Sequence, residues 1–346
     1  MSELLLRVRG VQVEFDGHPA VRDLSFDLHS AETLGLVGES GSGKSTLARA
    51  VLRLVGTSGG SVRWRGEELL TSAPKRLRAL RRDMQMVFQN PLASLNPRMR
   101  IAEAIAEPLE IFEPLLSAEA RAARVDAMLE RVGLNADMGG RYPHEFSGGQ
   151  CQRIGIARAM ILNPKLLVCD EPVSSLDVSI QGQIVNLLAD LQSERGTAMF
   201  FISHNLAVVR HLSRRIMVIF MGRCIESASR DELFANPLHP YSAALLAAAA
   251  GETMAAPLSV APPPGAESTA AESVGTPAVG PPAVGPPPLA PPTLGCWYRQ
   301  RCGYVIAVCS TIEPPFAEVS PGHFAACHRS REFYGGGQAS TLARSF

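Results

Sequence analysis

The chain has 346 residues, a length that suits about two domains, and its 33 Lys and Arg residues balance 33 Asp and Glu residues. We predict no nucleic-acid partner, because this balance leaves no basic footprint in the net charge. No apolar run reaches the ~18 residues needed to cross a bilayer, and because no basic–apolar–small pattern opens the chain we expect no secretory leader. Membrane association is therefore expected only through a partner.

The first 70 residues predict strands around a phosphate-binding loop. Segments 1–30 and 59–70 alternate like strands and predict a small antiparallel layer, while the apolar run 33–37 predicts a buried strand. A glycine-rich loop follows, and then apolar positions at helical spacing over 44–55. Strand, glycine loop and helix together form the context in which backbone amides cradle phosphates. We assign Lys44 to the β- and γ-phosphates and the Ser45 hydroxyl to Mg²⁺, and the nucleotide contacts to Gly38, Ser40, Gly41, Gly43, Lys44, Ser45 and Thr46.

The middle of the chain predicts a short strand and then a helical region. Gln89 follows a strand-like run at 84–88, but the Asn-Pro pair behind it is in itself only a turn signal. Residues 90–158 read as mostly helical, with one helix near 117–132 that Gly133 closes. A further helix over 150–162 opens after the stretch Ser147, Gly148, Gly149 and Gln150, whose amides are available as donors to a phosphate.

Two later apolar strands end in polar residues. The strand at 165–169 leads into Asp170 and Glu171, and the strand at 198–203 leads into His204. Ligands of open α/β sheets bind at the carboxyl ends of strands. Asp170 is therefore predicted to hold Mg²⁺, Glu171 to act as general base and His204 to contact the γ-phosphate. A helix over 178–194 that ends at Gly196 needs no function beyond packing.

These motifs, in this order, resemble those of the ATP-binding cassette (ABC) ATPases. Residues 146–150 are similar to the family signature, Asp170 and Glu171 to its Walker B carboxylates, residues 174–177 to its D-loop, His204 to its H-loop and Gln89 to its Q-loop. The resemblance implies an α/β P-loop cassette with a RecA-like parallel sheet core, an antiparallel β layer and a helical signature subdomain near 90–158.

The same resemblance implies how ATP is held. Two subunits meet head to tail over two ATP molecules, and the signature residues Ser147, Gly148, Gly149 and Gln150 of one face the phosphate loop of the other. Gln89 is implied as a further Mg²⁺ contact. Phe15 is implied as the aromatic that stacks on adenine, although a core position in its strand is the alternative.

Three positions depart from the family pattern. Cys151 stands where a basic residue is usual, Cys169 where a small residue is usual, and Asn205 where an aspartate is usual. None of these changes removes a catalytic group, so the sites to which this chain contributes are expected to be competent.

The chain divides into a cassette at 1–250, a Pro- and Ala-rich linker at 251–292 and a Cys-rich extension at 293–346. Four of the seven cysteines lie in the extension with the spacing C-x5-C-x6-C-x17-C: Cys296, Cys302, Cys309 and Cys327. Thiols of a cytosolic chain stay reduced, so such a group indicates metal more than disulfides. The residues alone leave an iron–sulfur cluster, Zn²⁺ and unligated thiols open, with His323 and His328 as alternative zinc ligands.

Residues 236–241, together with these cysteines, resemble the C-terminal extension of oligopeptide/dipeptide (peptide/nickel) transporter ATPases. Some members hold a [4Fe-4S] cluster on the four cysteines, so the resemblance implies such a cluster here in a structural role, with Zn²⁺ as the alternative. Gly303 departs from the proline that is usual after the second cysteine. His239 and Tyr241 are interpreted as packing residues at the start of a helix.

The resemblance predicts the energy-coupling subunit of an ABC importer for di-/oligopeptides or related small solutes. The implied partners are two transmembrane permeases, a second ABC ATPase that is either a copy or a paralogue, and an extracytoplasmic solute-binding protein. The implied location is peripheral, on the cytoplasmic face of the inner or plasma membrane. The alternative is the ATPase of a non-transport soluble assembly, such as a phosphonate-cleaving complex.

Overall fold

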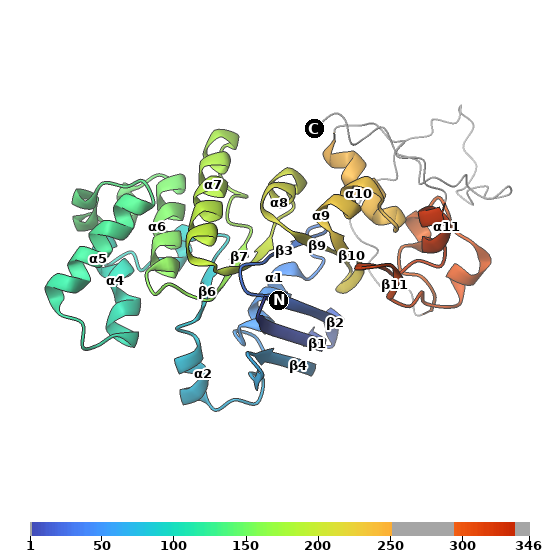
Figure 1. Cartoon of the computed structure of the whole chain (residues 1–346), viewed down its shortest axis with the longest axis horizontal. Coiled ribbons are helices and arrows are strands. Elements are labelled where there is room, and N and C mark those ends of the chain that lie inside the picture. Colours follow the sequence, from blue (N-terminus) through green and yellow to red (C-terminus); the bar gives the residue numbers. More distant parts are fainter. Residues whose placement is uncertain (1, 251–293, 336–346) are drawn as a thin grey trace. The chain divides into compact units, whose positions relative to one another are not determined.

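The structure, a computed structural model, describes residues 2–250 and 294–335 (Figure 1). These residues divide into two packing units. The first unit contains the chain up to residue 36 and residues 44–214. The second contains residues 37–43 and the described residues from 215 onward. The predicted linker at 251–292 lies outside the described residues.

The first unit contains the predicted antiparallel layer. Its strands run in the order β2-β1-β4-β5 and are β1 (Leu4–Phe15), β2 (His18–His29), β4 (Gly59–Trp64) and β5 (Glu67–Glu68). Apolar residues at alternating positions of β1, such as Leu6 and Val8, are fully buried, as the alternation in the sequence predicts.

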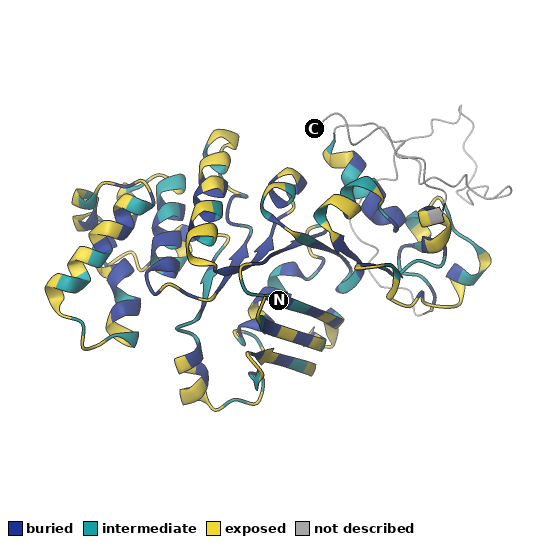
Figure 2. Cartoon of the chain, viewed as in Figure 1, coloured by how far each residue is buried: buried dark blue, intermediate teal, exposed yellow. Residues whose placement is uncertain are grey.

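The parallel sheet of the first unit has the order β3-β8-β7-β6, with β3 (Thr33–Val37), β8 (Ala198–Ile202), β7 (Leu166–Asp170) and β6 (Met84–Val87). Every residue of β7 and β8 is buried, as is typical of parallel strands covered on both faces (Figure 2). Because the strands are parallel, their carboxyl ends meet at one edge. The segments that carry Gln89, Glu171 and His204 all leave the sheet there.

Helices complete the first unit: α1 (Lys44–Val51), α2 (Pro74–Leu80), α3 (Pro91–Ser94), α4 (Ile101–Phe112), α5 (Ala118–Arg131), η1 (Ala136–Gly140), η2 (Pro143–Glu145), α6 (Gly148–Met160), α7 (Val178–Arg195) and α8 (Leu206–Leu212). Helices α4, α5 and α6 pack on one another (Figure 1). The predicted helices near 117–132 and 178–194 are confirmed, and Gly196 ends α7 in a left-handed conformation. The helix expected over 44–55 is shorter, because Arg53 adopts a φ of 50°.

The second unit has its own antiparallel strands in the order β9-β10-β12-β11: β9 (Arg215–Phe220), β10 (Arg223–Ser229), β12 (His323–Ala325) and β11 (Ala317–Ser320). Its helices are α9 (Arg230–Ala235), α10 (Pro240–Ala249), η3 (Arg299–Arg301), η4 (Ala307–Ser310) and α11 (Ser330–Gly335). Residues 294–335, the tail module below, therefore extend the sheet through β12.

A buried carboxylate fastens the tail module to β10. Glu226 is fully buried, and its Oε1 lies 2.8 Å from His323 Nε2 in β12. The same carboxylate accepts the backbone N–H groups of Leu238 at 2.7 Å and His239 at 2.9 Å. Leu238 also lies in a small apolar core with Ala325 and Phe333. One acidic side chain thus joins β10, the segment before α10 and β12.

Candidate nucleotide-binding site

Three residues from separate segments meet at the edge of the parallel sheet. The Glu171 carboxylate accepts a hydrogen bond from Gln89 Nε2 at 3.0 Å and lies 3.3 Å from His204 Nδ1. Glu171 has a φ of 47°, and its N–H donates to the Ile202 carbonyl at 3.0 Å. This left-handed backbone is uncommon for a non-glycine residue and here turns the chain at the end of β7. The sequence-predicted Gln89, Glu171 and His204 are therefore brought together.

Asp170 and Ser45 form a second polar pair in the first unit. The Ser45 hydroxyl donates to Asp170 Oδ1 at 2.7 Å. Asp170 is completely buried, and burial raises its carboxyl pKa, which the Ser45 bond and the Arg49 guanidinium partly offset. Asp170 Oδ2 has no hydrogen-bond partner among the described residues, and the Arg49 guanidinium stays 3.9 Å away. The Ser45 hydroxyl oxygen and the Asp170 Oδ2 atom are oxygen ligands of the kind that Mg²⁺ prefers.

The phosphate loop at 37–43 lies in the second unit. Gly38, Gly41 and Gly43 all have positive φ angles. At Gly38 a Cβ atom would lie 2.2 Å from the Ile219 carbonyl oxygen, so no other residue fits without movement of the backbone. The Ser42 carbonyl accepts the Gly222 N–H at 2.9 Å, which anchors the loop to the turn between β9 and β10.

The remaining loop-motif residues begin α1 in the first unit. Lys44, Ser45 and Thr46 form its first turn, and Lys44 is only 4% exposed. The Lys44 ammonium also opposes the rise in the Asp170 pKa. The Lys44 ammonium, the Ser45 hydroxyl and the Asp170 carboxylate thus lie at the start of this helix. These three groups are of the kinds that bind a nucleotide phosphate and its Mg²⁺ ion.

The signature residues form a helix cap. Ser147 caps α6 through its hydroxyl, which accepts the Gln150 N–H at 3.3 Å, and Gln150 Oε1 accepts the Ser147 N–H at 3.0 Å. At Gly149 a Cβ atom would lie 2.7 Å from Ile180 Cγ2, whereas at Gly148 the nearest atom is 3.7 Å away. The second glycine is therefore required by the close approach of α7.

Phe15 is not a core residue. It ends β1 and is 48% exposed, so the alternative interpretation of a core strand position is wrong. An exposed aromatic ring at a strand end is available for stacking.

The three departures from the family pattern have local structural roles. Cys151 and Cys169 are buried, and burial raises the pKa of both thiols. Asn205 caps α8 by accepting the N–H groups of Ala207 and Val208. An aspartate would cap in the same way, so this change leaves the segment after His204 intact.

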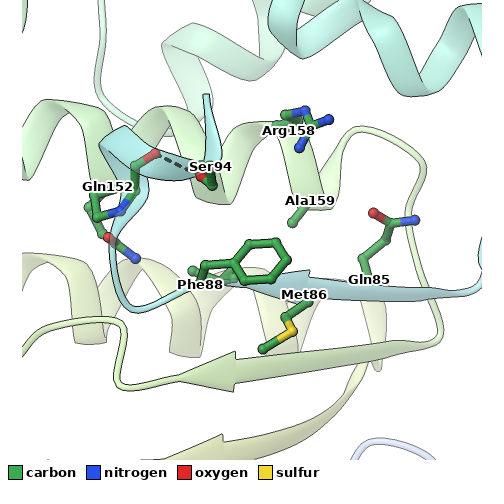
Figure 3. A pocket seen from close by; sticks show the side chains of 10 residues that line it. Gln85, Met86, Phe88, Ser94, Gln152, Arg158 and Ala159 are labelled. Atoms are coloured by element: carbon green, nitrogen blue, oxygen red, sulfur yellow. Dashed lines mark hydrogen bonds between the residues drawn. The ribbon is translucent and has the colours of Figure 1, made fainter. Parts of the chain in front are cut away.

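A small cavity, which the sequence did not predict, lies beside the segment that leads to Gln89 (Figure 3). It has a volume of about 20 Å³, lies between β6 and α6, and is lined in part by Met86, Phe88 and Gln152. Gln152 is 1% exposed, and its Nε2 has no hydrogen-bond partner in the described part of the chain. The cavity is large enough for one water molecule, which such an amide needs.

The four tail cysteines form no disulfide, and the pKa values of Cys302 and Cys327 are raised. Burial raises the pKa of Cys302 to about 11 and that of Cys327 to about 12, and the charges of the other tail thiols, Cys296 and Cys309 included, add to both shifts. Across residues 2–250 and 294–335, no three His, Cys, Asp or Glu side chains are grouped as metal ligands.

The two histidines named as alternative zinc ligands are engaged elsewhere. His323 is buried against Glu226, and His328 Nε2 lies 2.9 Å from the Ile312 carbonyl oxygen. His323 Nδ1 has no hydrogen-bond partner among the described residues, so a zinc-ligand role for these histidines stays a prediction.

His239 and Tyr241 are packing residues at the start of α10, as interpreted from the sequence. Burial lowers the pKa of His239 to about 3, so its ring is neutral and its Nδ1 accepts the Tyr241 N–H at 3.0 Å. Tyr241 also has a contact that the sequence did not predict. Its hydroxyl accepts the N–H of Glu39, a phosphate-loop residue that pairs with Arg301 of the tail module. Only the proximity in the fold reveals this contact.

A parallel sheet of this order, a glycine phosphate loop, a strand-end carboxylate pair and a capped signature helix define an ABC-type ATPase. A family profile described as "ABC transporter" matches residues 21–174, and one described as "Oligopeptide/dipeptide transporter, C-terminal region" matches residues 225–309. The "Oligopeptide transport ATP-binding protein OppF" of Haemophilus influenzae is 48% identical over 308 residues, which are 89% of this chain and 88% of that protein. The chain belongs to this family of ABC transporter ATP-binding proteins, and it is an ATPase.

Other relatives agree with this assignment. The "Putative oligopeptide transport ATP-binding protein YkfD" of Bacillus subtilis is 44% identical over 94% of this chain and 96% of its own length. The "Glutathione import ATP-binding protein GsiA" of Escherichia coli is 56% identical over 66% of this chain but only 37% of its own length. Among solved structures, the dimeric cassette MJ0796 bound to ADP and Pi matches with a TM-score of 0.61 and 26% identity, over 65% of this chain and 99% of that one. The predicted fold class is confirmed.

No helix in the part of the chain that the structure describes is both long and apolar enough to cross a membrane.

Proposed function

We propose that this chain is the ATP-hydrolysing, energy-coupling subunit of an ABC importer for di-/oligopeptides or related small solutes. The arrangement of Glu171 carries the proposal: its carboxylate is bound by Gln89 and lies beside His204, directly after the buried Asp170. The relatives named above have transport or import names, two for oligopeptides and one for glutathione. These names favour an importer over the alternative, the ATPase of a soluble enzyme assembly.

In this proposal Asp170 and Ser45 would hold Mg²⁺, with Gln89 as a further contact. A magnesium ion held there would offset the negative charge of the phosphates. Glu171 accepts a proton from the attacking water, and His204 contacts the γ-phosphate. The short distance between the Glu171 carboxylate and the His204 ring supports both roles.

The other site residues bind and orient the nucleotide. Phe15 stacks on adenine, and the phosphate contacts come from Gly38, Ser40, Gly41, Gly43, Lys44, Ser45 and Thr46. The signature of a second subunit completes the site through Ser147, Gly148, Gly149 and Gln150. The α6 N-terminus that Ser147 caps supports this role, since helix N-termini favour anions.

The partners are two transmembrane permeases, a second ABC ATPase that is either a copy or a paralogue, and an extracytoplasmic solute-binding protein. The chain is peripheral on the cytoplasmic face of the inner or plasma membrane. Purification of the chain with its native associates tests this assignment. Integral membrane proteins are expected in the complex, and recovery of soluble enzyme subunits instead would support the alternative function.

Glu171→Gln tests the catalytic assignment, because glutamine keeps the shape and one acceptor oxygen but cannot take a proton. ATP binding should remain, and turnover should fall by roughly 10²–10⁴-fold, the usual contribution of a general base. Glu110→Gln, which changes an exposed glutamate on α4, is the matched control. Unchanged turnover in Glu171→Gln would remove Glu171 from the mechanism.

The tail module is proposed to hold a [4Fe-4S] cluster on Cys296, Cys302, Cys309 and Cys327, with Zn²⁺ as the alternative. The charges of Cys296 and Cys309 raise the pKa of both Cys302 and Cys327, which requires these thiols to lie near one another and supports the proposal. The Tyr304 N–H donates to Cys302 Sγ at 3.3 Å. Hydrogen bonds to the sulfur ligands and limited solvent exposure are both typical of iron–sulfur sites.

Anaerobic purification tests the cluster. The protein should contain about four irons per chain, and Cys302→Ser should lose them while Cys151→Ser keeps them. A colourless protein with one zinc per chain identifies the alternative, and a metal-free protein rejects both.

A further inference from the structure

The tail module contacts the phosphate loop directly. The Arg301 guanidinium binds the Glu39 carboxylate through two hydrogen bonds, Nη2–Oε1 at 2.7 Å and Nη1–Oε2 at 3.2 Å. Glu39 lies between Gly38 and Ser40 in the loop, and Arg301 is 262 residues further along the chain. Both side chains are mostly buried, at 18% and 17% exposure, so solvent weakens this pair less than an exposed one.

A second contact holds the same loop residue from another side. The Glu39 N–H donates to the Tyr241 hydroxyl at 2.9 Å. Tyr241 is 2% exposed and packs its ring against Phe220 and Tyr298. Burial raises the pKa of Tyr241, so its hydroxyl is neutral at physiological pH. Glu39 is therefore fixed at both its backbone and its side chain.

Arg301 is itself held in place by aromatic rings. Its guanidinium carbon lies 5.8 Å from the centre of the Phe220 ring and 5.9 Å from that of Tyr298. Arg301 ends the short helix η3, and Cys302 follows it directly. The position of the guanidinium thus depends on the fold of the tail module.

The loop needs such support because its glycines leave it many conformations. Gly38, Gly41 and Gly43 have positive φ angles, which a glycine-rich segment does not hold by itself. Ordering the loop on nucleotide binding costs affinity, and a loop that is ordered beforehand avoids that loss. Two parallel bonds between a guanidinium and a carboxylate are well suited to fix both position and angle.

We propose that Arg301 is a positioning residue for the phosphate loop, and that the tail module orders the loop for nucleotide through Arg301 and Tyr241. The tail module thereby increases the affinity of the phosphate loop for ATP. This role depends on nucleotide binding by the loop and does not require a metal in the tail.

The test compares Arg301→Gln with Arg299→Gln in the full chain. Arg299 belongs to the same short helix, but its guanidinium donates to the Leu294 and Cys296 carbonyls and not to the loop. Binding of the ATP analogue with a β,γ-imido bridge, in the presence of Mg²⁺, is measured by calorimetry. Arg301→Gln should weaken binding about tenfold, and Arg299→Gln should stay within about twofold of wild type.

Two further measurements separate positioning from general stabilisation. In the nucleotide-free protein, hydrogen exchange in residues 37–43 should accelerate in Arg301→Gln, while exchange in residues 303–309 should not. A double-mutant cycle with Glu39→Gln should be non-additive, so the double variant binds no more weakly than the worse single variant. Tyr241→Phe, which removes the acceptor of the Glu39 N–H, should weaken binding in the same direction.

Several results overturn the proposal. They are wild-type affinity in Arg301→Gln, an equal loss in Arg299→Gln, or losses that multiply in the double variant. If Arg301→Gln unfolds the tail, Glu39→Gln carries the test from the loop side, and unchanged affinity in that variant is equally decisive. Failure of the wild-type chain to bind nucleotide would instead reject the proposed function.

Discussion

Replacement of Glu226 by glutamine is expected to loosen the tail module. The carboxylate of Glu226 is fully buried and accepts from three groups: the N–H of Leu238, the N–H of His239 and, through Nε2, the ring of His323. Glutamine has one acceptor oxygen where glutamate has two. Its amide nitrogen must therefore face a donor wherever it is placed.

The size of the effect follows from counting these donors. With the amide turned toward His239, one buried backbone N–H loses its acceptor, and the remaining bonds lose their charge assistance. An unsatisfied buried donor costs about 1–3 kcal/mol, and each bond to a charged group is stronger than a neutral one by about 1 kcal/mol. The second unit should therefore lose about 3–5 kcal/mol of stability, a drop in Tm of about 6–20 °C.

Scanning calorimetry and hydrogen exchange measure this change. Exchange should accelerate at residues 236–241 and at β12, which the carboxylate joins. Glu318→Gln is the matched control, because the Glu318 carboxylate accepts one N–H, that of Gly322 at 2.7 Å, at an exposed position. The control should change stability by less than about 0.5 kcal/mol. Equal Tm values for the two variants would refute this account of how the tail is fastened.

Three other changes give distinct outcomes. Asp170→Asn should stabilise the nucleotide-free protein at neutral pH, because burial raises the pKa of Asp170 and its anion is disfavoured in the fold. Thermal unfolding should show this gain vanish as the pH falls below about 4, where the carboxyl is protonated in both states. Gly149→Ala should lose about 1–3 kcal/mol in denaturant unfolding, since the new methyl group meets Ile180, whereas Gly148→Ala should be nearly neutral. Phe15→Ala should weaken ATP binding in calorimetry by about fivefold or more, with little change in Tm because Phe15 is half exposed; unchanged affinity would exclude adenine stacking.

Much of the cassette follows from local patterns in the sequence. The apolar runs of β7 and β8 predict buried parallel strands, and parallel strands bring their carboxyl ends to one edge. The proximity of Glu171 and His204 could therefore be predicted before any coordinates. Helix ends were equally predictable where one residue type sets them, as Ser117 and Gly196 do.

Other features depend on contacts between distant segments. The sequence predicted a glycine-rich loop and a cysteine-rich tail, but nothing in either pattern indicated that Arg301 pairs with Glu39. The shorter α1 and the exposed position of Phe15 likewise depend on how neighbouring elements pack.

The sequence by itself determined the chemistry of this protein, because the phosphate loop, the strand-end carboxylates and the signature are short motifs whose function depends on local backbone geometry. The tertiary structure alone decided which part of the chain supports the phosphate loop. That choice required Tyr241 and Arg301, which are far from the loop in sequence, to reach Glu39 through the fold of the second unit.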